Sequence, residues 1–174
     1  MRVVVPYAGS RGKTRVDLDP TAREELSRAM LEGVLAAAAG IGRTWVVSPD
    51  PVDGADWIPD PGGGQGAAVE AALGQLDAGP VLVVNADLPS VTTADLRALA
   101  AAIPEPGIAI AGATDGTTNA LGLSDPTLFA PLYGPDSAAR FRAHAARSGL
   151  TAVDVVRPGL RDDVDLLADL ESRA

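Results

Sequence analysis

Three positively charged side chains stand at alternate positions near the amino terminus, at Arg11, Lys13 and Arg15, and Lys13 is the only lysine of the chain. Gly9 and Gly12 accompany them. Glycine lets the backbone approach a bound group closely, and the cations would neutralise the charges of a polyphosphate. The spacing of a Walker A loop is absent. The segment predicts either a triphosphate-binding loop or a solvated loop with ordinary surface arginines.

A single carboxylate follows an apolar run in the middle of the chain. Residues 81–85 read Val-Leu-Val-Val-Asn, and Asp87 comes two residues later, with Pro89 fixing the chain just beyond it. A hard divalent cation such as Mg²⁺ takes one or two carboxylates together with substrate phosphates. We therefore predict that Asp87 holds Mg²⁺. The alternative is that this carboxylate caps the following turn.

Two further carboxylates, Asp163 and Asp165, alternate near the carboxyl terminus. In an extended segment both would point to one side, and such a pair is costly unless a cation or an arginine lies between them. The competing interpretation is that they are acidic caps of a helix that begins near Leu166.

A glycine-rich turn leads into a helical segment at Gly63, Gly64 and Gln65. The first turn of a helix has free backbone N–H groups and the positive end of the helix dipole, which suit a base edge or a phosphate. The alternative is a flexible surface turn.

Two more polar segments lie in the second half of the chain. Thr118 and Asn119 stand in a small polar stretch between apolar runs, where an anionic substrate could be bound, although a tight hairpin turn uses similar residues. Gly134 and Ser137 open a predicted helix. They could accept a phosphate there, or simply cap the helix.

The chain offers little for nucleophilic catalysis. His144 is the only histidine and lies within a predicted helix, and no serine stands in a nucleophile-elbow context. Phosphoryl and nucleotidyl transfer remain, because these reactions can proceed with positioning, cations and a metal alone.

The elements that must position these residues alternate along the chain, as in a layered α/β domain with a mostly parallel sheet. Predicted strands are Arg2–Pro6, Thr44–Val47, Val81–Asn85, Ile108–Ala111, Ala120–Leu123 and Ala152–Val156. Predicted helices are Pro20–Ala39, Gly66–Leu76, Thr92–Ala102, Asp136–Ser148 and Leu166–Arg173. Open α/β sheets bind ligands beyond the carboxyl ends of their strands, so the loops after strands are the expected site.

Size and composition narrow the class of protein. The 174 residues fit one domain, residues 1–174, with 47% apolar and only 3% aromatic residues, so small aliphatic side chains must build the core. The chain has no cysteine, which excludes disulfides and thiolate metal sites. A net charge of −9 argues against nucleic acid as a partner. No apolar run is long enough to span a membrane, and no targeting segment is apparent, so a cytoplasmic protein is expected.

Taken together and in this order, these segments resemble the 2-phospho-L-lactate/phosphoenolpyruvate guanylyltransferase family, within the MobA-like nucleotidyltransferases. The resemblance covers residues 3 to about 170 and is most particular in the threonine-asparagine turn and the Gly-Pro-X-Ser segment that follows it. It is carried by Arg11-Gly12-Lys13-Thr14-Arg15, Asn85-Ala86-Asp87-Leu88-Pro89, Thr117-Thr118-Asn119-Ala120-Leu121, Tyr133-Gly134-Pro135-Asp136-Ser137 and Asp163-Val164-Asp165.

The resemblance implies a fold and an activity. The fold would be glycosyltransferase-A-like, a Rossmann-like three-layer α/β sandwich with a mixed, mostly parallel sheet. GMP would pass from GTP, the co-substrate, to the phosphate of 2-phospho-L-lactate or phosphoenolpyruvate, with release of pyrophosphate, in biosynthesis of the deazaflavin coenzyme F420. The acceptor phosphate would attack the α-phosphorus in line. It would need no general base, because its oxygen is already anionic.

The resemblance also implies a role for each segment. The triphosphate and the leaving pyrophosphate would be steadied by Lys13, with Arg11 and Arg15 in support. Mg²⁺ would be bound by Asp87, Asp163 and Asp165. The acceptor side would comprise Thr118, Asn119, Gly134 and Ser137.

One turn departs from the family's pattern. The family has Gly-Gly-Leu-Asn where this chain has Gly63-Gly64-Gln65-Gly66. The base and ribose are expected at this turn, with Gln65 in place of the family's amide. Alternatives are a related nucleotidyltransferase with another acceptor (3-phosphoglycerate, a sugar phosphate or the molybdenum cofactor) and a nucleotide-binding module without catalysis. A homodimer is expected only by analogy.

Overall fold

A computed structural model of the chain describes residues 1–9 and 19–161. Its strands are β1 (Arg2–Pro6), β2 (Arg43–Ser48), β3 (Asp56–Pro59), β4 (Val81–Val84), β5 (Gly107–Gly112), β6 (Thr118–Leu123) and β7 (Thr151–Asp154). Its helices are α1 (Pro20–Ala39), α2 (Gln65–Leu73), α3 (Thr93–Ala101), the 3₁₀ helix η2 (Pro126–Leu128), α4 (Ser137–Arg147) and α5 (Pro158–Arg161).

The strands form one sheet in the order β3-β2-β1-β4-β6-β5-β7. β3, β2, β1 and β4 are parallel to one another, and β7 is parallel to β5. β6 runs antiparallel to both of its neighbours, β4 and β5. Within the described residues the sheet is therefore mixed and mostly parallel, as predicted.

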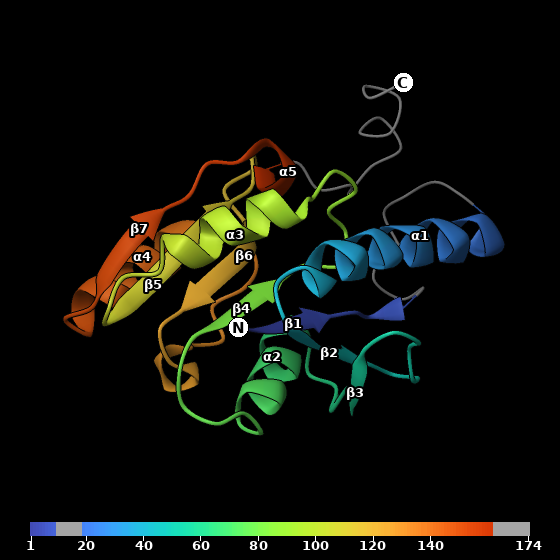
Figure 1. Cartoon of the computed structure of the whole chain (residues 1–174), viewed down its shortest axis with the longest axis horizontal. Helices are drawn as coiled ribbons and strands as arrows, with labels where there is room; N and C mark the ends of the chain where they lie inside the picture. The colour runs from blue at the N-terminus through green and yellow to red at the C-terminus, as the bar shows by residue number, and fades with distance from the viewer. Residues whose placement is uncertain (10–18, 162–174) are drawn as a thin grey trace.

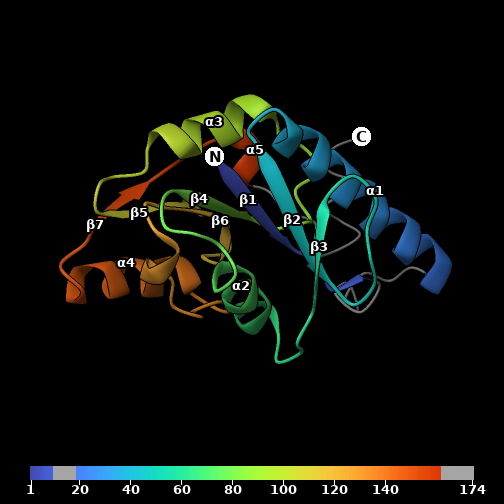
Figure 2. The same cartoon turned by 60° about the horizontal axis from the view of Figure 1, so that its bottom comes forward.

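Helices cover both faces of this sheet (Figures 1 and 2). On one face, α1, α3 and α5 bury Val34, Leu99 and Leu160 in one core cluster. On the other, α2 and α4 bury Val69 and Phe141 in a second cluster. Because each cluster also contains strand side chains, the sheet is apolar on both faces, as a covered parallel sheet must be. The predicted three-layer sandwich is confirmed.

Local signals account for the helices that frame the site. Asp19 caps α1 by accepting hydrogen bonds from the backbone N–H groups of the first turn, and Pro20 suits the first helical position. Thr92 and Asp95 form a reciprocal capping box at α3. In residues 1–9 and 19–161, no helix is both long and apolar enough to cross a bilayer.

Strand β1 and helix α1 have the predicted bounds, but β3 was not predicted. It is a four-residue edge strand in which only Ile58 is buried, so it carries no visible apolar pattern. The short α5 was not predicted either, and the helix predicted at residues 166–173 lies outside the described residues.

The polar stretch around Thr118 and Asn119 needs a correction. The turn of the chain lies just before these two residues: the Ala113 N–H donates to the Thr117 carbonyl at 2.9 Å, and Gly116 adopts a φ of 88°. Thr118 and Asn119 are buried residues of β6. Of the two interpretations, the structure therefore shows the hairpin, which joins β5 to β6. The correction is that Thr118 and Asn119 belong to the strand and not to the turn.

Candidate functional site

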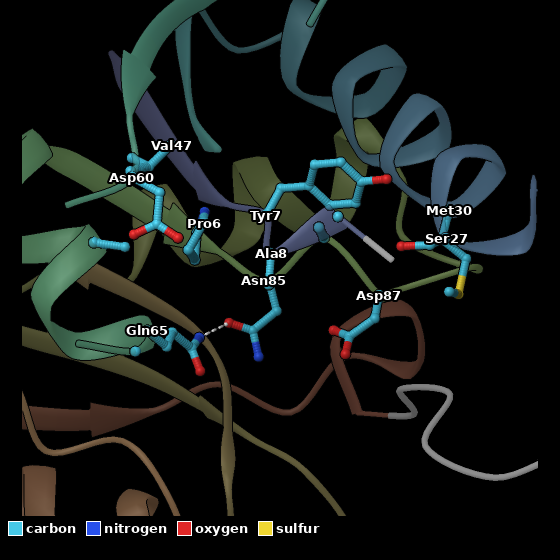
Figure 3. A pocket seen from close by; sticks show the side chains of 14 residues that line it. Pro6, Tyr7, Ala8, Ser27, Met30, Val47, Asp60, Gln65, Asn85 and Asp87 are labelled. Carbon is cyan, nitrogen blue, oxygen red and sulfur yellow. Dashed lines mark hydrogen bonds between the residues drawn. The ribbon is translucent and has the colours of Figure 1, made fainter. Parts of the chain in front are cut away.

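A pocket of about 210 Å³ opens where the carboxyl ends of the four parallel strands β3, β2, β1 and β4 meet (Figure 3). The segments that follow β1, β3 and β4 line it, together with the first turn of α2 and one side of α1. Its polar side chains are those of Tyr7, Ser27, Asp60, Gln65, Asn85 and Asp87. The pocket thus lies where open α/β sheets bind ligands.

The glycine-rich turn before α2 forms one wall of the pocket. Gly62, Gly63 and Gly64 all have positive φ angles, of 79°, 85° and 88°, so side chains there would strain the backbone. Gly64 is the N-cap of α2 and offers no side-chain cap, which leaves the first N–H groups of the helix available to a ligand. The predicted position of Gly63, Gly64 and Gln65 at a helix start is confirmed, with α2 beginning at Gln65.

Gln65 and Asn85 form a pair of side-chain amides inside the pocket (Figure 3). The Gln65 Nε2 donates to the Asn85 Oδ1 at 2.6 Å. The Asn85 Nδ2 in turn donates to the Thr118 carbonyl at 3.1 Å, which ties the pair to the edge of β6. The backbone N–H of Asn85 donates to the Asn119 carbonyl at 2.9 Å. Asn85 is therefore fixed by both its side chain and its backbone.

Asp87 lies two residues after Asn85, at the end of the pocket away from Asp60 (Figure 3). It follows the buried strand β4, as predicted. Among the described residues no group of three or more potential metal ligands occurs. One carboxylate still suits Mg²⁺, because this ion is commonly held by one or two carboxylates and by substrate phosphates. The other predicted ligands, Asp163 and Asp165, lie outside the described residues, as do Arg11, Lys13 and Arg15.

Asp60 is a pocket residue that the sequence interpretation missed. It directly follows β3, and its Oδ1 accepts a hydrogen bond from the Gly62 N–H at 2.9 Å. The same rule that pointed to Asp87, a carboxylate just after a strand, would have found Asp60 had β3 been recognised. Figure 3 shows its carboxylate directed toward the pocket.

Three predicted acceptor-side residues come together in the fold. The Ser137 Oγ donates to the Thr118 Oγ1 at 3.0 Å, and the Ser137 N–H donates to the Gly134 carbonyl at 3.1 Å. Both hydroxyl groups are on residues that are at most 1% exposed. In this conformation they hold the start of α4 against β6, and Gly134 is the member of the group that reaches the surface.

Asn119, also predicted on the acceptor side, is fully buried. Its Nδ2 donates to the carbonyls of Leu160 and Arg161 at 3.1 and 3.3 Å, and its Oδ1 has no hydrogen-bond partner among the described residues. Asn119 therefore anchors the end of α5 to β6, and its predicted role in substrate binding stays a prediction.

A second contact fixes α5 beside the segment that follows Asp87. Arg157 donates to Asp95 at 2.9 Å, and Gly159 packs so closely on Asp95 and the Ser90 carbonyl that it has no room for a Cβ. Burial alone would raise the pKa of Asp95, but hydrogen bonds from Thr92 and Arg157 hold that pKa below its usual range.

A second hollow, of about 570 Å³, adjoins the pocket, and Gln65 lines both. Gly66, Pro131, Tyr133 and Gly134 lie on its other sides. A Cβ added at Gly66 would lie 2.8 Å from the Pro131 Cβ, so α2 can pack against Pro131 only because residue 66 has no side chain. Position 66 therefore has no room for an amide side chain, and the amide of the turn is that of Gln65.

Comparison with known proteins gives a consistent family. The profile of the MobA-like NTP transferase domain matches residues 22–154. Phosphoenolpyruvate guanylyltransferase of Chloroflexus aurantiacus is 35% identical over 164 residues, covering 85% of this chain and 80% of that protein. 2-Phospho-L-lactate guanylyltransferase of Natrialba magadii is 37% identical over 195 residues, covering 98% of this chain and 81% of that protein.

The fold has known counterparts at much lower sequence identity. A nucleotide-diphospho-sugar transferase-like protein from Desulfovibrio desulfuricans G20 superposes with a TM-score of 0.81 at 15% identity, covering 99% of this chain and 85% of that one. This likeness confirms the predicted α/β fold.

Proposed function

The chain belongs to the 2-phospho-L-lactate/phosphoenolpyruvate guanylyltransferase family of MobA-like NTP transferases, and from this premise we propose that it transfers GMP from GTP to a phosphorylated three-carbon acid. Phosphoenolpyruvate and 2-phospho-L-lactate are the proposed acceptors, pyrophosphate is the second product, and biosynthesis of coenzyme F420 is the proposed pathway. The observation that carries the proposal is the pocket in which Asp60, the Gln65–Asn85 pair and Asp87 succeed one another.

Asp60 supports guanine as the base. The Watson–Crick edge of guanine carries two adjacent donors, the N1–H and the 2-amino group, and an ionised carboxylate can accept from both at once. Among the described residues the Asp60 carboxylate accepts one hydrogen bond, from the Gly62 N–H, so it retains acceptor capacity toward the pocket. Adenine lacks this pair of donors on its edge.

The position of Asp87 supports placing the phosphates at the other end of the pocket, away from Asp60. In the proposed complex it holds Mg²⁺ with Asp163 and Asp165, and the ion would neutralise charge on the triphosphate. Lys13, with Arg11 and Arg15, is proposed to hold the triphosphate and then the leaving pyrophosphate. The protein then has only to align the acceptor phosphate oxygen with the α-phosphorus, since that oxygen needs no base.

The hollow beside Gly134 supports the position of the acceptor. It shares Gln65 with the nucleotide pocket, so a small acid bound there would lie next to the nucleotide. The Thr118–Ser137 hydrogen bond holds the start of α4 in place and thereby sets the Gly134 backbone. A ligand-induced rearrangement of these hydroxyls would be needed for them to contact the acceptor directly.

Pyrophosphate release tests the proposal. The protein is mixed with Mg²⁺ and each of the four nucleoside triphosphates, crossed with phosphoenolpyruvate, 2-phospho-L-lactate and 3-phosphoglycerate. Release should require both substrates and should be fastest with GTP and one of the first two acids. No release with GTP and any of the acids would overturn the proposal, and release only with 3-phosphoglycerate would change the acceptor.

A further inference from the structure

We propose that the Gln65–Asn85 amide pair recognises the ribose hydroxyls of the donor nucleotide and makes the protein selective for ribonucleotides over deoxyribonucleotides. The inference rests on the proposed function, since it concerns the nucleotide in the same pocket. It assigns a specificity role to one hydrogen-bonded pair, which joins α2 to the segment after β4.

The hydrogen bonds of the pair determine which atoms face the ligand. The Thr118 carbonyl can only accept, so the Asn85 atom 3.1 Å from it must be the Nδ2, which places the Oδ1 on the other side of the amide. The Gln65 atom 2.6 Å from that Oδ1 must then be the donor, Nε2. The orientation of both amides is thus forced by the network.

The pair keeps hydrogen-bonding capacity for a ligand. The Gln65 Oε1 has no hydrogen bond to any residue in the described part of the chain, and the Asn85 Nδ2 has a second N–H beyond the one given to Thr118. The pair can therefore offer an acceptor and a donor from the same wall. A ribose hydroxyl both donates and accepts, so it can satisfy both.

The position of the pair selects the sugar among the parts of a nucleotide. Figure 3 shows Gln65 and Asn85 between Asp60 and Asp87. With guanine at Asp60 and the phosphates at Asp87, the part that lies between them is the ribose. The alternative, that the amides contact the base, is an outcome of the experiment below.

The pair is also rigid, which favours selectivity. Asn85 is held by Thr118 and by the Asn119 carbonyl, and α2 is held against Pro131 through Gly66. A fixed pair of polar atoms in a pocket loses a hydrogen bond when a hydroxyl is missing, because neither atom can turn to another partner.

The experiment compares GTP, 2′-deoxy-GTP, 3′-deoxy-GTP and inosine triphosphate. Dissociation constants are measured by calorimetry without acceptor, and kcat/KM by pyrophosphate release with acceptor. The variants are Gln65→Leu and Gln65→Met, which remove the amide at similar length. Gln75→Leu is the matched control, because Gln75 lies beyond the end of α2 and outside the pocket, and its side chain bonds only to the Ala71 carbonyl among the described residues.

Wild type and Gln75→Leu should prefer GTP over at least one deoxynucleotide by about tenfold, the effect of about one hydrogen bond. Both Gln65 variants should reduce that preference to about twofold or less and leave the ratio of GTP to inosine triphosphate unchanged. The inference is overturned if wild type shows no such preference, if the Gln65 variants retain it, or if the inosine ratio changes instead. Wild type that fails to bind GTP at all overturns the proposed function as well, whereas the other results leave that function standing.

Discussion

At the scale of single residues, Asp60 determines how the base is read in the proposed complex. Its carboxylate reaches the pocket from the end of an edge strand, and the neighbouring Gly62 N–H fixes one oxygen. A carboxylate fixed in this way presents only acceptors to the two adjacent donors of guanine. Exchange of one oxygen for an NH₂ group would set a donor against a donor.

Asp60→Asn should therefore lower kcat/KM for GTP by about 10- to 100-fold, since charged hydrogen bonds contribute more than neutral ones. The preference for GTP over inosine triphosphate, which lacks the 2-amino group, should narrow in parallel. Pyrophosphate release measures both ratios, with Asp53→Asn as a control at an exposed aspartate of the β2–β3 connection. An unchanged preference in Asp60→Asn would mean that another group reads the base.

At the scale of elements, the contact between α2 and Pro131 joins the two hollows of the site. Gly66 brings the helix onto Pro131, and Gln65 beside it belongs to both cavities. A methyl group at position 66 would separate these elements by displacing the Pro131–Gly134 segment.

Gly66→Ala should reduce stability by about 1–3 kcal/mol through overpacking and should raise the KM for the acceptor. Gly33→Ala is the matched control, because Gly33 is an exposed glycine within α1 whose added Cβ meets nothing within 4 Å. That change should stabilise the protein by about 0.5–1 kcal/mol. Urea denaturation measures both variants, and a stable Gly66→Ala with unchanged KM would contradict the packing argument.

The Asp95 carboxylate, which accepts hydrogen bonds from Thr92 and Arg157, predicts a dependence of stability on pH. The pKa of Asp95 in the folded protein lies below its unfolded value, so the stabilisation is complete at neutral pH and is lost as the pH falls through the folded pKa. Asp95→Asn should be less stable than wild type by about 1–2 kcal/mol at neutral pH. That gap should shrink as the pH falls below about 4. Urea denaturation of both proteins across this pH range tests the prediction. A difference in unfolding free energy that does not change with pH would exclude the ionised Asp95 carboxylate as its cause.

Helices and strands with a strong local sequence pattern could be predicted from the sequence. The edge strand β3 and the contacts between residues distant in sequence could not. β1 and β4 are apolar runs, and α1 begins at Pro20, so their positions were evident. β3 is short and half exposed, and missing it meant missing Asp60. Thr118 and Asn119 look like turn residues, but their partners, Ser137 and Leu160, are distant in sequence, and no local pattern reveals such burial.

At the scale of the whole molecule, ligand binding should raise the stability of the entire fold, because the pocket draws on β1, β3, β4 and α2 together. A ligand at about a hundred times its Kd stabilises by about 2.7 kcal/mol. For a chain of this size, that corresponds to a rise of several degrees in Tm.

Thermal unfolding of wild type with GTP and Mg²⁺ should therefore shift upward by several degrees, and chelation of the metal should remove part of the shift. Asp87→Asn should abolish turnover and show only the smaller, metal-independent shift. Without ligand its Tm should stay close to that of wild type. A wild-type shift that is the same with and without Mg²⁺ would contradict the assignment of Asp87 as a metal ligand.

The reversed direction of β6 marks a boundary between the proposed nucleotide side and the proposed acceptor side of the site. Four parallel strands deliver the nucleotide side of the site by their carboxyl ends, and β6 delivers Thr118 and Asn119 to the same edge by its amino end. At that edge, side-chain and backbone contacts cross the boundary from Asn85 to these two residues. A chimaera that replaces β5, β6 and α4 should therefore change the proposed acceptor side, and it should keep the proposed nucleotide side only if the new strand retains the two backbone carbonyls that hold Asn85.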